Sequence, residues 1–453
     1  MKRFFLFALA ATVFAACSTA TLEMPIPSNQ IWYTSSNGKI VKPNATDVFW
    51  ANIISNTYEN GVGIITFDGD VTTIGYSAFD NCFALKSITI PDSVTTIGNY
   101  AFRYCDALTS VTIPDSVTEI GYMAFCYCSA LTSVTIPDSV TTIGDSAFYN
   151  CNALTSVTIP DSVTTIGNYA FRYCGALTSI TIPDSVTTIG YGAFTSCSAL
   201  KAFYGKFASE DNRCWIIDGV LKCFAPAGLT TYSIPDSVTT IGNSAFAYCD
   251  ALTSVTIPDS VTTIGGAAFY NCSALTNVTI PDSVTTIGYG AFYNCSALTS
   301  VTIPDSVTTF GEYAFYNCDA LKAFYGKFAS KDNRCLIVNG VLKSFAPAGL
   351  TTYSIPDSVT TIGGGAFDDC SSLKSVTIPD SVTTIGEGAF WGCNALKEVY
   401  CKPTTPPSLG IYVFNGNASG RKIYVPTASV DAYKAADGWK GYADAIEPYN
   451  FTE

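Results

Sequence analysis

The sequence predicts a repeat solenoid whose coils carry a parallel β-sheet on one face and short helical turns on the other. A unit of 23 residues, IPDSVTTIGNYAFRYCDALTSVT at residues 90–112, recurs from about Thr72 to Leu396. Apolar and hydroxyl residues alternate in the SVTI part of most units, which is typical of a strand with one buried face. A period of this length means that each coil buries its apolar side chains only against its neighbours.

Each part of a coil follows from its residues, as the segment 108–128 illustrates. The alternating residues 110–113 predict the strand, and Pro114 ends it because proline cannot donate to the ladder. Asp and Ser at 115–116 favour a turn. Residues 117–120 predict a second short extended piece, and the apolar residues of 124–128 stand at helix-like spacing.

The pattern divides the chain into a signal segment (residues 1–17), an N-terminal cap (18–64), the repeat array (65–399) and a C-terminal cap (400–453). Solenoids need such caps because a terminal coil would otherwise expose its apolar face.

The caps contain elements of their own. In the N-terminal cap, Asn37 and Gly38 predict the turn of a hairpin over residues 31–41. The apolar residues of 49–58 are expected to cover the first coil. In the C-terminal cap, residues 422–426 predict a strand and residues 429–436 predict a short helix.

The amino terminus predicts an export signal. Two basic residues precede an apolar run over residues 4–14, which is too short to span a bilayer. The small residues Ala15 and Ala16 stand directly before Cys17, as they do before the lipidated cysteine of bacterial lipoproteins. We therefore predict lipidation at Cys17 and membrane attachment only through that lipid anchor. The alternative is an ordinary signal peptide whose cysteine is incidental.

The chain carries 36 acidic and 23 basic residues, a formal charge of −13. This charge speaks against nucleic acid and anionic membranes as partners, because both need a positive face. The sequence has no histidine, which removes Ser-His-Asp and Cys-His catalysis and His-ligated zinc. We therefore expect a protein that is not an enzyme, with no catalytic residue, metal site or cofactor.

Twelve of the 18 cysteines occupy one repeated position. A disulfide framework is one interpretation for an exported protein. Stacked equivalent positions, however, lie about 4.8 Å apart, which is longer than the Cβ separation of a disulfide. We therefore predict a ladder of reduced, buried cysteines.

Two coils, residues 201–233 and 322–354, are longer than the others and nearly identical to each other. Each contains an Asp-Gly or Asn-Gly hairpin signal, and these hairpins are expected to project from the solenoid. A two-residue turn at residues 218–219 would place Cys214 opposite Cys223. This pair is the one candidate disulfide.

Three surfaces are candidates for binding. The outward hydroxyl rows of the strands are able to recognise a repetitive glycan, although threonine is also simply a good residue for a solvent-facing strand. The aspartates of the IPDS segments form a ladder that is able to bind calcium, although they also fit ordinary turn chemistry. Aromatic residues recur where the coils vary, and they either bind a partner or pack against each other. They include Tyr122, Tyr191 and Tyr289, and the candidates for a partner-binding edge are Tyr104, Tyr127, Tyr149, Tyr173, Tyr248, Tyr270, Tyr293, Tyr316 and Trp391.

The recurring CxxLxxVxIPxxVxxIGxxAFxxC pattern, with Ala101, Phe102 and Cys105 as one example, resembles the leucine-rich repeats of the BspA-like family. The resemblance covers some 330 residues. It implies a right-handed leucine-rich-repeat coil and an exported, non-enzymatic protein of a Gram-negative bacterium. It transfers no ligand-binding residue, because the shared motif is structural.

The expected function is cell-surface recognition or adhesion. An extended repeat surface would bind an extracellular protein, such as host matrix, or a glycan by many weak contacts. The alternative is a carbohydrate-binding accessory lipoprotein of a glycan-uptake system. We expect a monomeric outer-membrane lipoprotein that faces the cell exterior rather than the periplasm.

Overall fold

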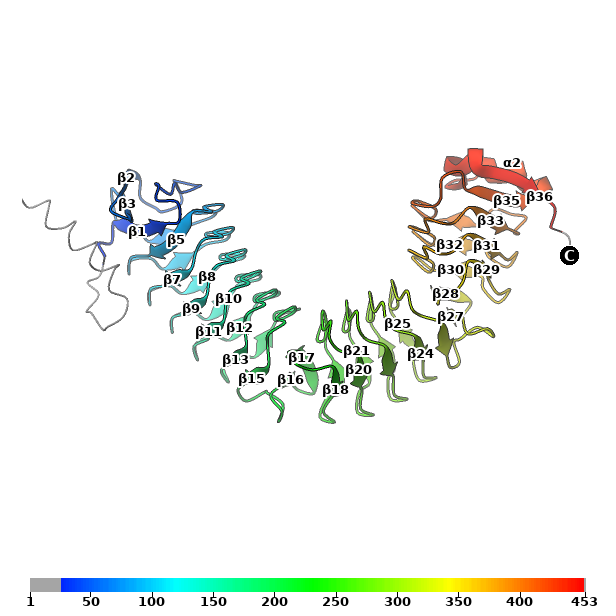
Figure 1. The fold of residues 1–453 in the computed structure, drawn as a ribbon, viewed down its shortest axis with the longest axis horizontal. Helices are drawn as coiled ribbons and strands as arrows, with labels where there is room; N and C mark the ends of the chain where they lie inside the picture. The colour runs from blue at the N-terminus through cyan, green and yellow to red at the C-terminus, as the bar shows by residue number, and fades with distance from the viewer. Residues whose placement is uncertain (1–25, 452–453) are drawn as a thin grey trace, which may run out of the picture. The chain divides into compact units, whose positions relative to one another are not determined.

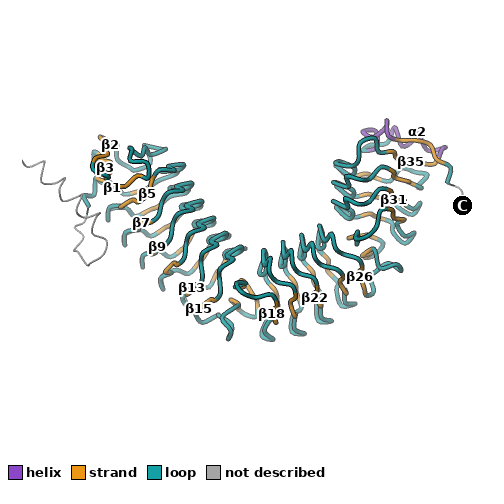
Figure 2. Tube along the Cα trace, viewed as in Figure 1, coloured by secondary structure: helices purple, strands orange, loops and turns teal. Residues whose placement is uncertain are grey.

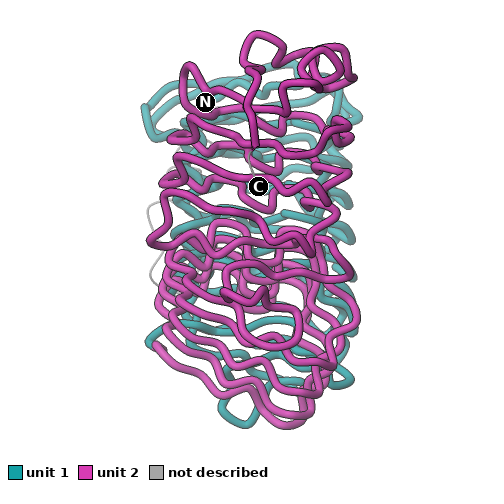
Figure 3. Tube along the Cα trace, turned by 90° about the vertical axis from the view of Figure 1, so that its right-hand side faces the viewer, with its two compact units in different colours: residues 1–228 teal, residues 229–453 magenta. Residues whose placement is uncertain are grey.

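The computed structural model describes residues 26–451, so the signal segment and Cys17 lie outside the described residues. The chain forms two units, residues 1–228 and 229–453 (Figure 3). Each unit is a stack of coils, and the predicted solenoid with parallel strands is confirmed.

In the first unit, each coil contributes one short strand to a parallel ladder (Figure 1). Residues one repeat apart face each other, so that Val111 lies opposite Val134. Both side chains are buried while the flanking Ser and Thr are exposed, as the alternation predicts. The strands β5 (Leu85–Thr89), β7 (Ser110–Thr112), β9 (Ser133–Thr135) and β11 (Ser156–Thr158) form one sheet, and β13 (Ser179–Thr181) and β15 (Ala202–Tyr204) form a separate pair after it.

The second extended piece of each coil forms its own parallel ladder of two-residue strands. Its isoleucines also stack in register, with Ile143 between Ile120 and Ile166. The strands are β4 (Thr73–Ile74), β6 (Thr96–Ile97), β8 (Glu119–Ile120), β10 (Thr142–Ile143), β12 (Thr165–Ile166) and β14 (Thr188–Ile189).

The N-terminal cap is antiparallel. Strand β1 (Gln30–Ser35) lies between β5 and β3 (Val62–Phe67), and β3 forms a hairpin with β2 (Ile53–Glu59). The predicted hairpin at Asn37 and Gly38 is therefore wrong: β1 already takes both of its partners from β3 and β5, which leaves no edge for residues 39–41. Phe49 covers the first coil as predicted, with its ring 5.8 Å from that of Phe79.

The second unit repeats the two ladders. Its first ladder consists of three sheets. They are β18 (Thr231–Ser233), β20 (Ser254–Thr256) and β22 (Asn277–Thr279); β24 (Ser300–Thr302) and β26 (Ala323–Tyr325); and β29 (Thr352–Ser354), β31 (Ser375–Ile378), β33 (Glu398–Cys401), β35 (Lys422–Pro426) and β36 (Ile446–Tyr449). Its second ladder consists of two parts, β19 (Thr240–Ile241), β21 (Thr263–Ile264), β23 (Thr286–Ile287) and β25 (Thr309–Phe310), and then β30 (Thr361–Ile362), β32 (Thr384–Ile385) and β34 (Ser408–Leu409).

The C-terminal cap agrees with the prediction. Strand β35 spans the expected residues, and it is followed by the turn η1 (Thr427–Ser429), the helix α2 (Val430–Ala435) and the 3₁₀ segment η2 (Trp439–Ala445). Tyr433 and Trp439 are fully buried and close the last coil. The sequence analysis did not predict β36.

The segment expected to form a helical turn in each coil is instead a chain of tight turns. Within the described residues, helix occurs only in the C-terminal cap (Figure 2). In residues 98–105, backbone N–H groups bond alternately within the coil and to the next coil: Arg103 N donates to Tyr100 O (3.1 Å), and Tyr104 N donates to Cys126 O (2.8 Å). In a helix these N–H groups would bond within the segment. Because half of them donate to the next coil instead, the segment does not form a helix.

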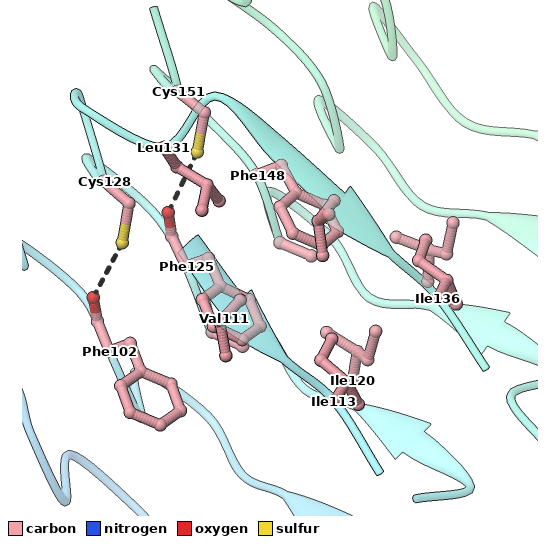
Figure 4. Packing of buried hydrophobic residues seen from close by; sticks show 14 of the residues in the cluster. Phe102, Val111, Ile113, Ile120, Phe125, Cys128, Leu131, Ile136, Phe148 and Cys151 are labelled. Atoms are coloured by element: carbon pink, nitrogen blue, oxygen red, sulfur yellow. Dashed lines mark hydrogen bonds between the residues drawn. The ribbon is translucent and has the colours of Figure 1, made fainter. Parts of the chain in front are cut away.

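The core consists of continuous files of side chains. The repeat phenylalanines stack nearly parallel: Phe125 and Phe148 have ring centroids 5.4 Å apart, and Phe148 and Phe171 have centroids 5.3 Å apart. Figure 4 shows this file beside the buried isoleucines of the two ladders. Every coil therefore buries its rings mainly against the coils directly before and after it.

The two long coils carry the predicted hairpins, β16 (Cys214–Ile217) with β17 (Val220–Phe224) and β27 (Cys335–Val338) with β28 (Val341–Phe345). The expectation that the hairpins project is wrong for both of them. In the first hairpin, Trp215 and Leu221 are fully buried. In the second, strand β28 pairs with β30 and extends the second ladder, and Leu336 and Leu342 are fully buried. Their apolar side chains explain the difference, because burial in the stack removes them from water.

Candidate binding surface

The turn region that follows the repeat glycine forms one long edge in each unit. Residues there adopt left-handed backbone conformations, with φ of 59° at Tyr100 and 57° at Tyr104. Such residues direct neighbouring side chains outward and leave the alternate N–H groups free to bond to the next coil. Equivalent side chains consequently lie one coil spacing apart along the edge.

Eight of the nine predicted edge aromatics form what we call the Phe-side tyrosine row, because each follows the repeat phenylalanine by one or two positions. In the first unit, the ring centroids of Tyr104 and Tyr127 lie 4.6 Å apart with an interplanar angle of 20°. Along the same row, the ring centroids of Tyr127 and Tyr149 lie 5.5 Å apart, and those of Tyr149 and Tyr173 lie 5.4 Å apart. All four side chains are half-buried.

The second unit has its own Phe-side row. Tyr248 and Tyr270 lie 5.4 Å apart, Tyr270 and Tyr293 lie 4.9 Å apart, and Tyr293 and Tyr316 lie 4.3 Å apart. The last two pairs are nearly parallel, at 19° and 21°. The interpretation that these rings pack against each other thus describes the geometry, and their binding of a partner stays a prediction. Trp391, the ninth residue, is 44% exposed.

A second row, which we call the Gly-side tyrosine row, lies beside the first. Its members follow the repeat glycine by one or two positions: Tyr76, Tyr100, Tyr122, Tyr169 and Tyr191 in the first unit, and Tyr289 and Tyr313 in the second. Its adjacent members make edge-to-face contacts at 5.1–5.5 Å. Tyr76 and Tyr289 are 62% and 60% exposed. Tyr122, Tyr191 and Tyr289 of this row were among the aromatic residues noted in the sequence, but the row itself was not predicted.

Arginines join the two rows in the first unit. The Arg103 guanidinium lies 4.5 Å from the ring centroid of Tyr100 and 5.4 Å from that of Tyr104, and Arg172 lies similarly between Tyr169 and Tyr173. Such cation–π contacts are typical of guanidinium over tyrosine.

Arg103 also binds Asp80 on the preceding coil. Its Nε and Nη2 atoms donate to the two carboxylate oxygens at 3.0 and 2.7 Å, and this hydrogen bonding raises the pKa of Arg103. The Asp80 side chain is only 6% exposed. Spacing alone did not reveal this pair, because the two residues are 23 positions apart in a slot that varies between coils.

The cysteine ladder is structural, and its members are buried as predicted. Nine of the twelve thiols donate to the carbonyl oxygen of the phenylalanine one coil earlier. Cys128 Sγ lies 3.1 Å from Phe102 O, and Cys151 Sγ lies 3.2 Å from Phe125 O (Figure 4). Burial raises the pKa of the Cys197 thiol to about 12. These thiols are therefore poor nucleophiles at neutral pH.

The first hairpin does not place Cys214 opposite Cys223, as the candidate disulfide requires. A bulge in the first hairpin places Cys223 opposite Trp215, and Cys214 lies opposite Phe224. The assumed register is therefore wrong, because the turn at 218–219 is followed by one extra residue in the second strand. Both cysteines are buried.

Glycan binding by the strand hydroxyl rows and calcium binding by the IPDS aspartates stay predictions. In the strand rows, Ser133 and Thr135 are exposed. The serine of the IPDS segment donates to a carbonyl of the preceding coil, as Ser162 Oγ does to Val140 O at 2.7 Å. The neighbouring aspartates are exposed. Among residues 26–451, no three His, Cys, Asp or Glu side chains are placed to hold a metal ion. No helix of the described residues is long and apolar enough to cross a membrane.

Comparison with known families agrees with this architecture. The family model described as a BspA type leucine rich repeat region matches residues 58–204, 221–331 and 342–435. The chain belongs to the BspA-type leucine-rich repeat family. The two internal gaps in the match lie in the long coils, where the hairpins depart from the BspA-type unit. Proteins of this family are typically exported or displayed at the surface and are generally non-enzymatic.

Solved structures provide similar BspA-type chains. A leucine rich cell surface protein from Faecalibacterium prausnitzii is 32% identical, with 72% of this chain and 86% of that one covered and a TM-score of 0.48. A leucine-rich repeat protein from Eubacterium ventriosum is 26% identical, with 73% and 90% covered and a TM-score of 0.46. One from Bacteroides ovatus is also 26% identical, with 87% and 90% covered and a TM-score of 0.37. No curated protein matches the sequence.

Proposed function

We propose that this protein is a surface-displayed adhesin that binds an extracellular protein along its tyrosine edge. The observation that carries the proposal is the pair of Phe-side rows, each with four consecutive tyrosines. Tyrosine contributes large contact area and a hydroxyl group at low cost in side-chain entropy, which is why it is frequent at interfaces. Repetition along a coil edge makes the contact multivalent.

The stacking geometry favours a protein over a sugar at this edge. Sugar rings bind aromatic side chains by lying against a ring face. Tyr293 has both faces occupied, by Tyr270 and Tyr316, and therefore offers its edge and hydroxyl group. The alternative function, a carbohydrate-binding accessory lipoprotein, receives no support from this row.

Binding rather than catalysis also agrees with the chemistry of the chain. The sequence has no histidine, the ladder thiols are buried, and burial raises the pKa of the Cys197 thiol. Lipidation of Cys17 and placement on the outer membrane are part of the proposal. They rest on the amino-terminal sequence alone.

The proposal is tested by adhesion to immobilised fibronectin, laminin and collagen. We expect the chain from Ser18 onward to bind at least one of them and the variant Tyr127→Ser, Tyr149→Ser, Tyr270→Ser, Tyr293→Ser to bind at least about tenfold more weakly, since interface tyrosines commonly dominate affinity. The matched control, Thr135→Ala with Thr158→Ala, changes the exposed strand face and should bind normally. No binding by the native chain, or equal losses in both variants, would contradict the proposal.

A further inference from the structure

A pocket lies where the second long coil interrupts the Phe-side row of the second unit. That coil lacks an AFxxC element, so the coil that carries Tyr316 is followed along the edge by the one that carries Asp368. The pocket is lined by residues from both, including Tyr313, Tyr316, Asp319, Asp368 and Asp369. Its volume is about 20 Å³, which is enough for one water-sized group.

The position that Asp368 occupies in its repeat is also occupied by an aspartate in the first unit. Asp368 directly follows a repeat phenylalanine, as Asp80 does. Asp80 is held by the two hydrogen bonds from Arg103, whose guanidinium lies against Tyr100. Tyr313 has the same position in its own coil as Tyr100, but its coil precedes Asp368, whereas the coil of Tyr100 follows Asp80. The pocket therefore combines a carboxylate with an aromatic ring, as the first arrangement does, with the ring on the opposite side of the carboxylate in the stack.

The cation of that arrangement has no counterpart at Asp368. The residue one coil later, at the position equivalent to Arg103, is Trp391. The Asp368 Oδ1 atom is buried and has no hydrogen-bond partner. Lys343 also lines the pocket, but the ion pairs among residues 26–451 are those of Arg103, Lys422 and Lys440 with acidic partners elsewhere.

The surroundings of Asp368 favour a positive charge. Asp369 accepts a hydrogen bond of 3.3 Å from the Tyr316 hydroxyl, and the rings of Tyr313 and Tyr316 stand at 70° to each other with centroids 5.8 Å apart. Burial is the main cause that raises the pKa of Asp368 to about 7, and the nearby charge of Asp369 adds to it. A cation would relieve the cost of the buried charge and would meet the electron-rich ring faces.

We propose that this pocket binds a primary ammonium group, namely a lysine side chain of the protein partner, which supplies Asp368 with the positive charge that Arg103 supplies to Asp80. An ammonium group is close in size to a water molecule and donates three hydrogen bonds, which suits a cavity of this volume with acceptors on several sides. Only the source of the ammonium group rests on the proposed adhesive function.

The test uses Nα-acetyl-lysine methylamide, titrated into the chain from Ser18 onward at pH 8 and followed by calorimetry. We expect saturable binding that Nε-acetylation of the probe abolishes, because acetylation removes the charge. Asp368→Asn should weaken binding at least about tenfold, as expected for loss of the charged partner of a hydrogen bond. The control Asp357→Asn removes an exposed carboxylate of the same unit and should bind as the native chain does.

Equal binding of the acetylated probe, unchanged affinity of Asp368→Asn, or no saturable binding to the native chain would overturn the proposal. Circular dichroism of Asp368→Asn checks that the variant is folded, and Tyr313→Ala provides a second variant that leaves every carboxylate in place. This variant should also weaken binding, because it removes a ring face. Since the probe is a small molecule, the ammonium site stands or falls independently of the adhesion assay.

Discussion

From the stacking of the repeat phenylalanines we predict how much stability the variant Phe148→Ala loses. Phe148 is fully buried and lies between Phe125 and Phe171 at 5.4 and 5.3 Å, with interplanar angles of 2° and 5°. Truncation of a buried phenylalanine costs about 3–5 kcal/mol, and the loss of two stacked partners places this site in the upper half of that range. We take about 4 kcal/mol as the expected loss.

Because a coil contacts mainly its neighbours, the loss should be local. Hydrogen exchange followed by mass spectrometry reads opening coil by coil. We expect exchange roughly a thousandfold faster in peptides of the coils that carry Phe125, Phe148 and Phe171, since 1.4 kcal/mol corresponds to about a factor of ten. Peptides around Phe79, three coils away, should change far less.

The adjacent residue provides the matched control. Tyr149 is half-buried, and Tyr149→Ala should cost only about 1–2 kcal/mol because much of its ring already contacts water. The reasoning would be refuted if exchange rose equally throughout residues 26–228, or if the two variants lost the same protection.

Three further predictions address charges and thiols. Arg103→Met should lower the free energy of unfolding by about 2–4 kcal/mol in urea titration, because it leaves the buried Asp80 carboxylate unpaired; an equal effect of Lys440→Met, whose partner Asp437 is exposed, would argue against this. Asp368→Asn should leave the free energy of unfolding unchanged near pH 4 and raise it by about 1–2 kcal/mol at pH 8. The raised pKa of Asp368 means that its protonated form stabilises the fold at low pH, and this stabilisation of the native chain is lost as the pH rises through 7. Solvent screening keeps the expected difference small. In the chain from Ser18 onward, Ellman's reagent should label the 17 thiols only after unfolding, and a final count lower by two would reveal the Cys214–Cys223 bridge; rapid labelling of the native chain would contradict the buried ladder.

The sequence predicted the features that follow from period and alternation. The 23-residue repeat determines that Val111 faces Val134, and Pro114 ends the strand in the expected place. Strand β35 was also predicted correctly, because its alternation resembles that of the coils. These are local patterns, and the stack preserves them because every coil repeats its neighbour's environment.

The errors arose where tertiary partners decide local structure. Asn37 and Gly38 are a good hairpin signal, but β1 pairs with β3 and β5 instead. The spacing of residues 124–128 resembles a helix, yet bonds between coils replace the helical ones. Because of a one-residue bulge, Cys223 faces Trp215 instead of Cys214, and the Asp-Gly turn signal does not predict such a bulge.

At the candidate site, the positions of the edge aromatics were predictable, but their contacts were not. Tyr127 and Tyr149 stand at different distances from the repeat phenylalanine, and only the structure shows that their rings still meet. The pairing of Arg103 with Asp80 depends on which residues happen to occupy one variable slot on consecutive coils. The pocket at Asp368 forms because the second long coil lacks an AFxxC element, and the regular repeat pattern does not predict a cavity at such a coil.

The central claim is that the repeat array binds its partner by many similar contacts along its length. The most direct measurement is the affinity for the immobilised matrix protein after deletion of whole coils in register: residues 113–135 in one chain, and residues 113–158 in another. Both deletions join a strand to an IPDS segment and preserve the stack. We predict a stepwise loss of affinity with each coil removed, while circular dichroism stays native-like. Full affinity in the chain that lacks both coils would contradict the account.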